Sequence, residues 1–227
     1  MSKIIVTKKG IEKLLKGLNI TKAMDPDNIH PRVLKELASE LSEIMAHFFQ
    51  QSIDTGSIPS EWKKDNICPL FKKNDRSIPS NYRPVSLTCI SCKLLGHIIC
   101  SNLMQHFEKN NILNNRQHDF RNNHSCETQL VNVIHDWATA IDNRQQVDIF
   151  ILDFEKAFDT VPHDLLKSKL HRYSVPKNIM NWTDSFLSNR QQCVVVNGCK
   201  SEESAVVSGA PQGTVPGQYY SSSTSTT

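Results

Sequence analysis

An almost unbroken apolar run occupies residues 147–152 and ends at Asp153. Its four consecutive apolar residues, Ile149 to Leu152, leave no polar side, which is typical of a β-strand covered on both faces. Such a strand requires a sheet with other elements packed above and below it. A carboxylate that closes a buried strand lies at the edge of the sheet, where a divalent metal or a phosphate can reach it. A helix N-cap or a turn residue is the simpler alternative for Asp153.

Apolar residues at helical spacing predict helices on either side of this strand. After a short helix near the start, a longer one is expected to begin at Pro31 and end before Gly56. Further helices are predicted over about 93–108, after Ser125 as N-cap, and over about 163–173 and 178–187. We expect three of these helices to bury one face. The residues of those faces are Leu34, Leu37, Leu41, Met45, Phe48 and Phe49; Leu95, Ile99, Leu103 and Phe107; and Leu130, Ile134, Trp137 and Ile141.

Short strands and turns separate these helices. The apolar run over 66–71 predicts a short strand, within a stretch rich in proline and charge. Asn197–Gly198 stands between two apolar segments and is the commonest two-residue hairpin turn, so we expect a hairpin there. The loop over 208–214 is rich in glycine, and a Ser/Thr-rich tail that we expect to be disordered follows it.

The positive charge of the chain is concentrated in one segment. The chain has 227 residues and a formal net charge of only +3. Between Trp62 and Arg83, however, six basic residues stand against two aspartates. Such a stretch is typical of surfaces that bind phosphate backbones, although a solvated loop is the simpler alternative. The six basic residues are Lys63, Lys64, Lys72, Lys73, Arg76 and Arg83.

The seven cysteines are an odd number and no signal peptide opens the chain, so we expect a reducing, intracellular location. No apolar stretch reaches the roughly 20 residues of a membrane span, and we expect no membrane partner. The series Cys89, Cys92, His97 and Cys100 has a spacing close to that of zinc ligands. We expect no zinc there, because the residues between them carry helical periodicity, which predicts small buried cysteines instead. No local signature supports a Cys/His nucleophile pair.

Five segments carry a family resemblance when taken together and in order. They are NYRPVSLTCISCKLLGHII, RQHDFRNNHSCETQL, DIFILDFEKAFDTVPHDLL, FLSNRQQCVVVNG and SGAPQGTVPG. They resemble the reverse transcriptase of non-LTR (LINE-type) retrotransposons. The resemblance runs from near residue 4 to about Gly217, and the leaders DPDNIHPRVLKELA and TGSIPSEWKK are similar to the family's N-terminal extension.

The resemblance implies an α+β, right-hand polymerase fold with fingers and an incomplete palm. It implies a helical N-terminal extension over 1–60 and a fingers-like region over 61–145. A partial palm with a returning fingers hairpin would cover 146–217, before a disordered tail over 218–227. In this family the Asp-Asp motif follows the last of the five segments. No two aspartates are adjacent in this sequence, and none follows Asp184.

The resemblance also implies the reaction and its partners. These are an RNA template, a DNA primer and a dNTP, with two Mg²⁺ ions steadying the attacking and leaving oxygens. Asp153 would be the catalytic carboxylate that binds metal, assisted by the carbonyl of Phe154. The nucleotide would meet the fingers arginine Arg121, the amides of Lys156 and Ala157, the steric gate Phe158 against a ribose 2′-hydroxyl, and the pocket residues Gln212 and Gly213.

Two departures from the family pattern concern the nucleotide site. Asp119 replaces a glycine, and His124 stands where the family has a basic residue, so we expect weaker triphosphate binding. A single candidate carboxylate would also bind two divalent ions only weakly. We therefore expect a reverse transcriptase fragment that is inactive by itself. The alternatives are a non-catalytic nucleic-acid-binding module and a metal nuclease, which would need more clustered carboxylates.

Overall fold

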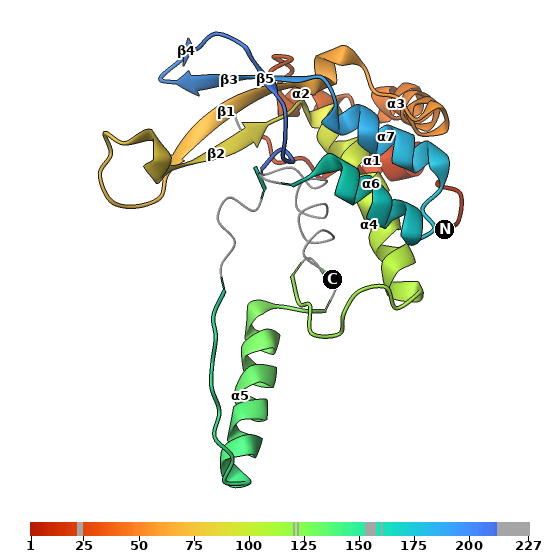
Figure 1. Cartoon of the computed structure of the whole chain (residues 1–227). Coiled ribbons are helices and arrows are strands. Elements are labelled where there is room, and N and C mark those ends of the chain that lie inside the picture. Colours follow the sequence, from red (N-terminus) through yellow and green to blue (C-terminus); the bar gives the residue numbers. More distant parts are fainter. Residues whose placement is uncertain (22–24, 120, 122, 153–157, 160, 213–227) are drawn as a thin grey trace.

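The computed structural model describes residues 1–21, 25–119, 121, 123–152, 158–159 and 161–212 (Figure 1). Within these ranges the chain forms α-helices, two short 3-10 helices and strands. The helices are α1 (Lys8–Lys16), α2 (Pro31–Glu36), α3 (Ala38–Thr55), α4 (Ile90–Lys109), α5 (Cys126–Asp142), α6 (His163–Arg172) and α7 (Lys177–Leu187), with the 3-10 helices η1 (Ser60–Lys63) and η2 (Pro79–Asn81). The strands are β1 (Lys64–Phe71), β2 (Tyr82–Leu87), β3 (Arg190–Val196), β4 (Cys199–Lys200) and β5 (Ser204–Val206).

Six helices, all those of the described residues except α5, contribute to a common apolar core (Figure 1). Leu15 of α1, Phe49 of α3, Leu95 of α4, Leu166 of α6 and Trp182 of α7 are all fully buried in it. Since these residues come from both ends of the chain, the N-terminal helices and the helices after residue 160 stabilise each other.

A glycine sets the close approach of α3 to α7. Gly56 caps the end of α3 in the left-handed conformation, with φ of 66°. A Cβ atom there would lie 2.6 Å from Cβ of Asn181 and 2.8 Å from the carbonyl oxygen of Asn178, both in α7. The helix end predicted before Gly56 is therefore confirmed, and the glycine is also needed for packing.

The sheet has the order β2-β1-β3-β4, and β5 pairs with β3. β1 and β2 are antiparallel, whereas β1 and β3 are parallel, with Lys64 opposite Gln191. The predicted strand over 66–71 and the predicted hairpin are both confirmed. Asn197 and Gly198 have φ angles of 48° and 81°, as a tight hairpin turn of this kind requires.

The helix predicted to begin at Pro31 is interrupted at Leu37, where ψ is 24°. Leu34 of α2 and Ala38 of α3 are both buried, and the break between them turns Leu37 outward. Leu37 is 45% exposed and Phe48 is 42% exposed, so these two residues do not belong to the buried face predicted for this helix.

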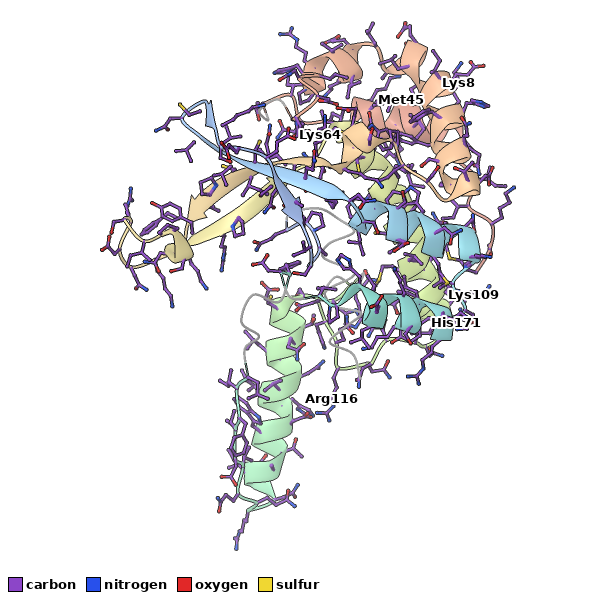
Figure 2. The ribbon with its side chains drawn as sticks, turned by 45° about the horizontal axis from the view of Figure 1, so that its top comes forward. Lys8, Met45, Lys64, Lys109, Arg116 and His171 are labelled. Atoms are coloured by element: carbon purple, nitrogen blue, oxygen red, sulfur yellow. The ribbon has the colours of Figure 1, made fainter. Side chains whose placement is uncertain are left out.

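The strand predicted over residues 147–152 is wrong for this structure. The segment has no regular secondary structure, and Phe150, Ile151 and Leu152 are 87%, 89% and 91% exposed. It runs beside α5, which projects away from the helical body (Figures 1 and 2). In the described part of the chain no strand pairs with it. An apolar run forms a buried strand only if other elements supply hydrogen bonds and cover, and here they do not.

The buried face predicted for the helix after Ser125 is also wrong. Ser125 does cap α5, since its hydroxyl accepts a hydrogen bond from the backbone N–H of Thr128. However, Leu130, Ile134 and Ile141 are each more than half exposed, because no element among the described residues covers that face. None of the helices in the described ranges is long and apolar enough to span a membrane.

Candidate functional site

Two loops that are far apart in the sequence are joined by hydrogen bonds. The backbone N–H of Ala210 donates to the carbonyl oxygen of Phe158 at 2.8 Å. The hydroxyl of Ser208 donates to the carbonyl oxygen of Asp159 at 3.2 Å. These bonds bring Phe158 to the loop that carries Gln212, so two of the predicted nucleotide-site residues belong to one junction.

A glycine makes this junction possible. Gly209 has φ of 85°, and a Cβ atom there would lie 2.7 Å from the carbonyl oxygen of Phe158 and 2.8 Å from the backbone of Asp159. A side chain at this position would therefore push the two loops apart. The glycine-rich composition of the loop thus has a definite geometrical cause.

Hydrogen bonds attach the junction to both the helical body and the sheet. The imidazole Nε2 of His163, the first residue of α6, lies 2.7 Å from the carbonyl oxygen of Gly209. The backbone N–H of Ser86 in β2 donates to the carbonyl oxygen of Gln212 at 2.8 Å. The loop over 208–212 therefore bridges the helical body and the sheet, beside the strand that also carries Arg83.

Arg121 is held by a carboxylate. Its Nε and Nη2 donate to the two carboxylate oxygens of Glu108, each at 2.8 Å, and its Nη1 donates to the carbonyl oxygen of Asn114 at 2.9 Å. The hydrogen bond from Arg121 holds the pKa of Glu108 below its usual value. In this structure the guanidinium predicted to bind phosphate therefore ties the loop after α4 to that helix.

Asp119 and His124, the two residues that depart from the family pattern, lie near Arg121 in the sequence. Asp119 is exposed, and the ring of His124 meets the ring of His118 edge to face, with centroids 4.9 Å apart. His118 is buried and lies 2.9 Å from the hydroxyl of Thr128 in α5. His118 thus contacts both His124 and the first turn of α5.

The six predicted basic residues divide into two groups. Lys63 and Lys64 lie where β1 begins, close to the helical body, and Figure 2 labels Lys64 there. Burial lowers the pKa of Lys63, and a hydrogen bond from Lys64 to Glu61 raises the pKa of Lys64. Lys72, Lys73, Arg76 and Arg83 are exposed on the β1–β2 hairpin.

The tip of this hairpin is built by aromatic and polar contacts. The guanidinium carbon of Arg76 lies 4.8 Å from the centre of the Phe71 ring, which meets Tyr82 edge to face. Tyr82 in turn donates to the carbonyl oxygen of Arg76 at 2.9 Å, and Asp75 accepts from Ser77. These contacts therefore order the loop without a bound partner.

The remaining predicted site residues lie outside the described residues. They are Asp153, Phe154, Lys156, Ala157 and Gly213. In the described part of the chain, no three His, Cys, Asp or Glu side chains gather as a metal site. The described residues alone therefore do not form a metal centre.

Sequence reasoning missed a buried ion pair beneath the sheet. Arg190 donates to both carboxylate oxygens of Asp65, at 2.6 and 3.2 Å, and both side chains are almost fully buried. Burial raises the pKa of Asp65, against the opposing effect of Arg190. The pair joins the first residues of β1 and β3, and no local pattern in the sequence could have paired them.

The predicted cysteine environment is confirmed. Cys89, Cys92 and Cys100 are buried at the start of α4 and along it, whereas His97 is exposed on another side of that helix. Burial raises the pKa of the Cys100 thiol, and contact with Cys92 together with burial raises that of Cys89. The four side chains do not share one face.

Comparison with known proteins gives a consistent result. A family described as "Reverse transcriptase (RNA-dependent DNA polymerase)" matches residues 71–223. The chain is 29% identical over 214 residues to the RNA-directed DNA polymerase from mobile element jockey of Drosophila melanogaster. That alignment covers 93% of this chain and 23% of the relative. Probable RNA-directed DNA polymerases from transposon BS and transposon X-element of the same fly are each also 29% identical, over 91% and 86% of this chain.

The chain spans about a quarter of the length of these relatives, 22% to 23%. The family match implies a reverse-transcriptase-like polymerase fold, which agrees with the mixed α/β architecture. The family also implies a divalent metal, a nucleic-acid template with its primer, and nucleotide substrates. The chain therefore belongs to the reverse transcriptase family, as a part of the RNA-directed DNA polymerase that non-LTR retrotransposons encode.

Proposed function

We propose that this chain forms the nucleotide- and template-binding part of such a polymerase. The junction of the Phe158 loop, the loop over 208–212 and β2 is the observation that supports this proposal. The two loops carry Phe158 and Gln212, which the family resemblance assigns to the nucleotide, and β2 carries Arg83 of the basic stretch. The hydrogen bonds from Ala210 to Phe158 and from Ser86 to Gln212 connect these three segments.

In this proposal the ring of Phe158 excludes a ribose 2′-hydroxyl, and Gln212 with Gly213 shapes the pocket for the base and sugar. The backbone amides of Lys156 and Ala157 face the triphosphate. Arg121 binds phosphate by exchanging the carboxylate of Glu108 for phosphate oxygens, since a guanidinium recognises both in the same two-pronged manner.

The carboxylate of Asp153 and the carbonyl oxygen of Phe154 are the proposed Mg²⁺ ligands. Oxygen donors of these two kinds are the ones that Mg²⁺ prefers. When bound, the ions stabilise the attacking and leaving oxygens of phosphoryl transfer. The chain's own contribution is to hold the nucleotide sugar against Phe158 and to keep water out between the two joined loops.

The exposed basic residues of the β1–β2 hairpin are the proposed contact with the phosphate backbone of the template and primer. Lys72, Lys73, Arg76 and Arg83 are exposed on a loop that its own contacts already order. Lys63 and Lys64, at the other end of β1, are a second proposed contact with the nucleic acid. A preformed basic surface loses little conformational entropy on binding.

Binding to an RNA–DNA primer–template tests this proposal. We expect an affinity that falls with salt, and a variant with Lys63, Lys64, Lys72 and Lys73 all changed to Gln should bind more weakly with a shallower salt dependence. Fluorescence anisotropy of a labelled primer measures both. The matched control changes four exposed lysines of α1 to Gln: Lys8, Lys9, Lys13 and Lys16. Equal losses in the two variants, or no binding at low salt, would contradict the proposal.

A non-catalytic binding module is the second candidate, favoured by the single candidate metal carboxylate of this sequence. We expect the chain alone to bind without extending the primer, because two-metal catalysis needs further carboxylates. Primer extension on RNA with Mg²⁺ checks this expectation. Extension above background that Asp153→Ala abolishes would show that the chain is active by itself.

A further inference from the structure

The loop over 208–212 is hydrogen-bonded to two segments, one without regular structure and one at the start of a helix. On one side its hydrogen bonds reach Phe158 and Asp159, in a short segment without regular structure. On the other side the anchor is His163, the first residue of α6. Leu166 and Leu170 of that helix are fully buried in the core. His163 is therefore a side chain by which the helical body hydrogen-bonds the loop, beside the burial of Ala210 in the same core.

The contact from His163 is directional. Since the carbonyl oxygen of Gly209 can only accept, Nε2 of His163 must carry the hydrogen and donate it, across 2.7 Å. The side chain is half-buried, and its backbone is fixed by the helix. Gly209 itself is buried and has no Cβ, so its carbonyl stays within reach of the imidazole while its backbone touches Phe158.

The groups next to Gly209 are those of the proposed nucleotide pocket. Its neighbour Ala210 holds the carbonyl of Phe158, and Gln212 is held by Ser86 of β2. A shift of the Gly209 carbonyl would therefore change the separation between the Phe158 ring and Gln212. That separation decides which sugar fits between them, if the pocket has the role given above.

We propose that His163 is a positioning residue that holds the Phe158 loop and the loop over 208–212 in register, which here means in a fixed position relative to each other. Through this register it sets the discrimination between deoxyribose and ribose nucleotides. The second statement rests on the proposed function, and the first does not. His163 touches neither the nucleotide nor the metal and acts only through the backbone of Gly209.

Hydrogen exchange tests the register without any ligand. In His163→Ala the backbone amide of Ala210 should exchange about fivefold faster, the effect of losing one ordinary hydrogen bond. His163→Gln, whose side-chain amide can donate from nearly the same place, should restore most of the protection. His171→Ala is the matched control, because His171 lies exposed at the other end of α6 (Figure 2). Unchanged exchange at residues 208–212 in His163→Ala would overturn the proposal.

A second variant separates a local effect from poor folding. Gly209→Ala keeps His163 but places a Cβ against the backbone of Phe158 and Asp159, and it should open the same loop. Circular dichroism should give both variants a helix content equal to that of the unchanged chain. Equal protection of the loop in Gly209→Ala and the unchanged chain would count against the register.

Nucleotide binding tests the consequence. The probes are dTTP and UTP with Mg²⁺, added to the chain bound to an RNA–DNA primer–template that presents adenine. In His163→Ala the preference for dTTP should fall about fivefold, and His163→Gln should recover it. A merely structural role would weaken both nucleotides equally, which would overturn the second statement. If the unchanged chain binds neither nucleotide, the proposed function fails together with that statement, and the exchange experiment still decides the register.

Discussion

Asp65 and Arg190 are enclosed together at the starts of β1 and β3, with less than 3% of either side chain exposed. The guanidinium also lies over the ring of Phe186, at 4.7 Å from its centre, and donates to the carbonyl oxygen of the same residue. All three guanidinium nitrogens and both carboxylate oxygens therefore take part in hydrogen bonds. Removing one partner would leave the other as an uncompensated buried charge, which is far more costly than removing both.

Arg190→Met should destabilise the chain by about 3–5 kcal/mol, because it leaves the carboxylate of Asp65 buried and unpaired. The double variant Asp65→Leu with Arg190→Met should recover most of that loss. Urea unfolding followed by circular dichroism measures both. Lys8→Met is the control: its pair with Glu43 is exposed, and we expect a much smaller loss of stability. Similar losses in Arg190→Met and Lys8→Met would contradict the prediction.

The pair between Glu108 and Arg121 gives a pH dependence of known sign. The hydrogen bond from Arg121 lowers the pKa of Glu108 below its ordinary value of 4.5. The stabilisation is therefore fully present above pH 4.5 and is lost as the pH falls through the lowered pKa. Glu108→Gln should flatten this part of the profile. The test is the urea midpoint of both chains between pH 7 and pH 3; parallel profiles would contradict the assignment.

At the scale of whole elements, α4 and α5 have similar apolar patterns, but only α4 is packed against other helices. α4 lies within the helical body with Leu95 and Ile99 fully buried, whereas no residue of α5 is buried. The capping box at Ser125 and Thr128 fixes where α5 begins, but a cap contributes only about 1 kcal/mol. Because most of the stability of a helix in a protein comes from packing of its apolar face, α5 should be the least protected of the described helices.

Truncating one isoleucine in each helix separates the two cases. Ile99→Ala should cost about 2–5 kcal/mol, since it opens a cavity in the core. Ile134→Ala should cost less than about 0.5 kcal/mol, since that side chain is 56% exposed and the change favours helix. Urea unfolding measures both variants. A large loss for Ile134→Ala would show that another element covers α5 in solution.

These two helices also show how much of the fold the sequence could predict. The cap at Ser125, the end of α3 before Gly56 and the turn at Asn197–Gly198 depend on neighbouring residues, and all were predictable. Whether an apolar face is covered depends on elements elsewhere in the chain, so the burial of α5 and of residues 147–152 was predicted wrongly.

The candidate site shows the same division. Phe158 and Gln212 could be selected from the sequence through a family resemblance. The bonds that join their loops, through Gly209 and His163, connect residues 46 positions apart and had no local signal. The partner of Arg121 was not foreseen either, because a guanidinium fits a carboxylate as well as a phosphate.

For the molecule as a whole, the main apolar surface lies on α5 and the segment beside it. Phe150 and Leu152 should make the chain associate with itself as its concentration rises, because exposed apolar surface is buried by contact between molecules. Phe150→Ser with Leu152→Ser should reduce light scattering without lowering the free energy of unfolding. Val207→Ser removes one equally exposed apolar residue and serves as control. Unchanged scattering in the double variant would contradict this prediction.

The parallel pairing of β1 with β3 also determines when the sheet can close during synthesis. Asp65 and Arg190 lie 125 positions apart. A ribosome adding about 5–20 residues per second needs roughly 6–25 s to cover that distance. Until then β1 and β2 can exist only as a hairpin, and water hydrates the Asp65 carboxylate in place of Arg190. The β1–β3 pairing can thus form only after the segment that separates the two strands has been synthesised.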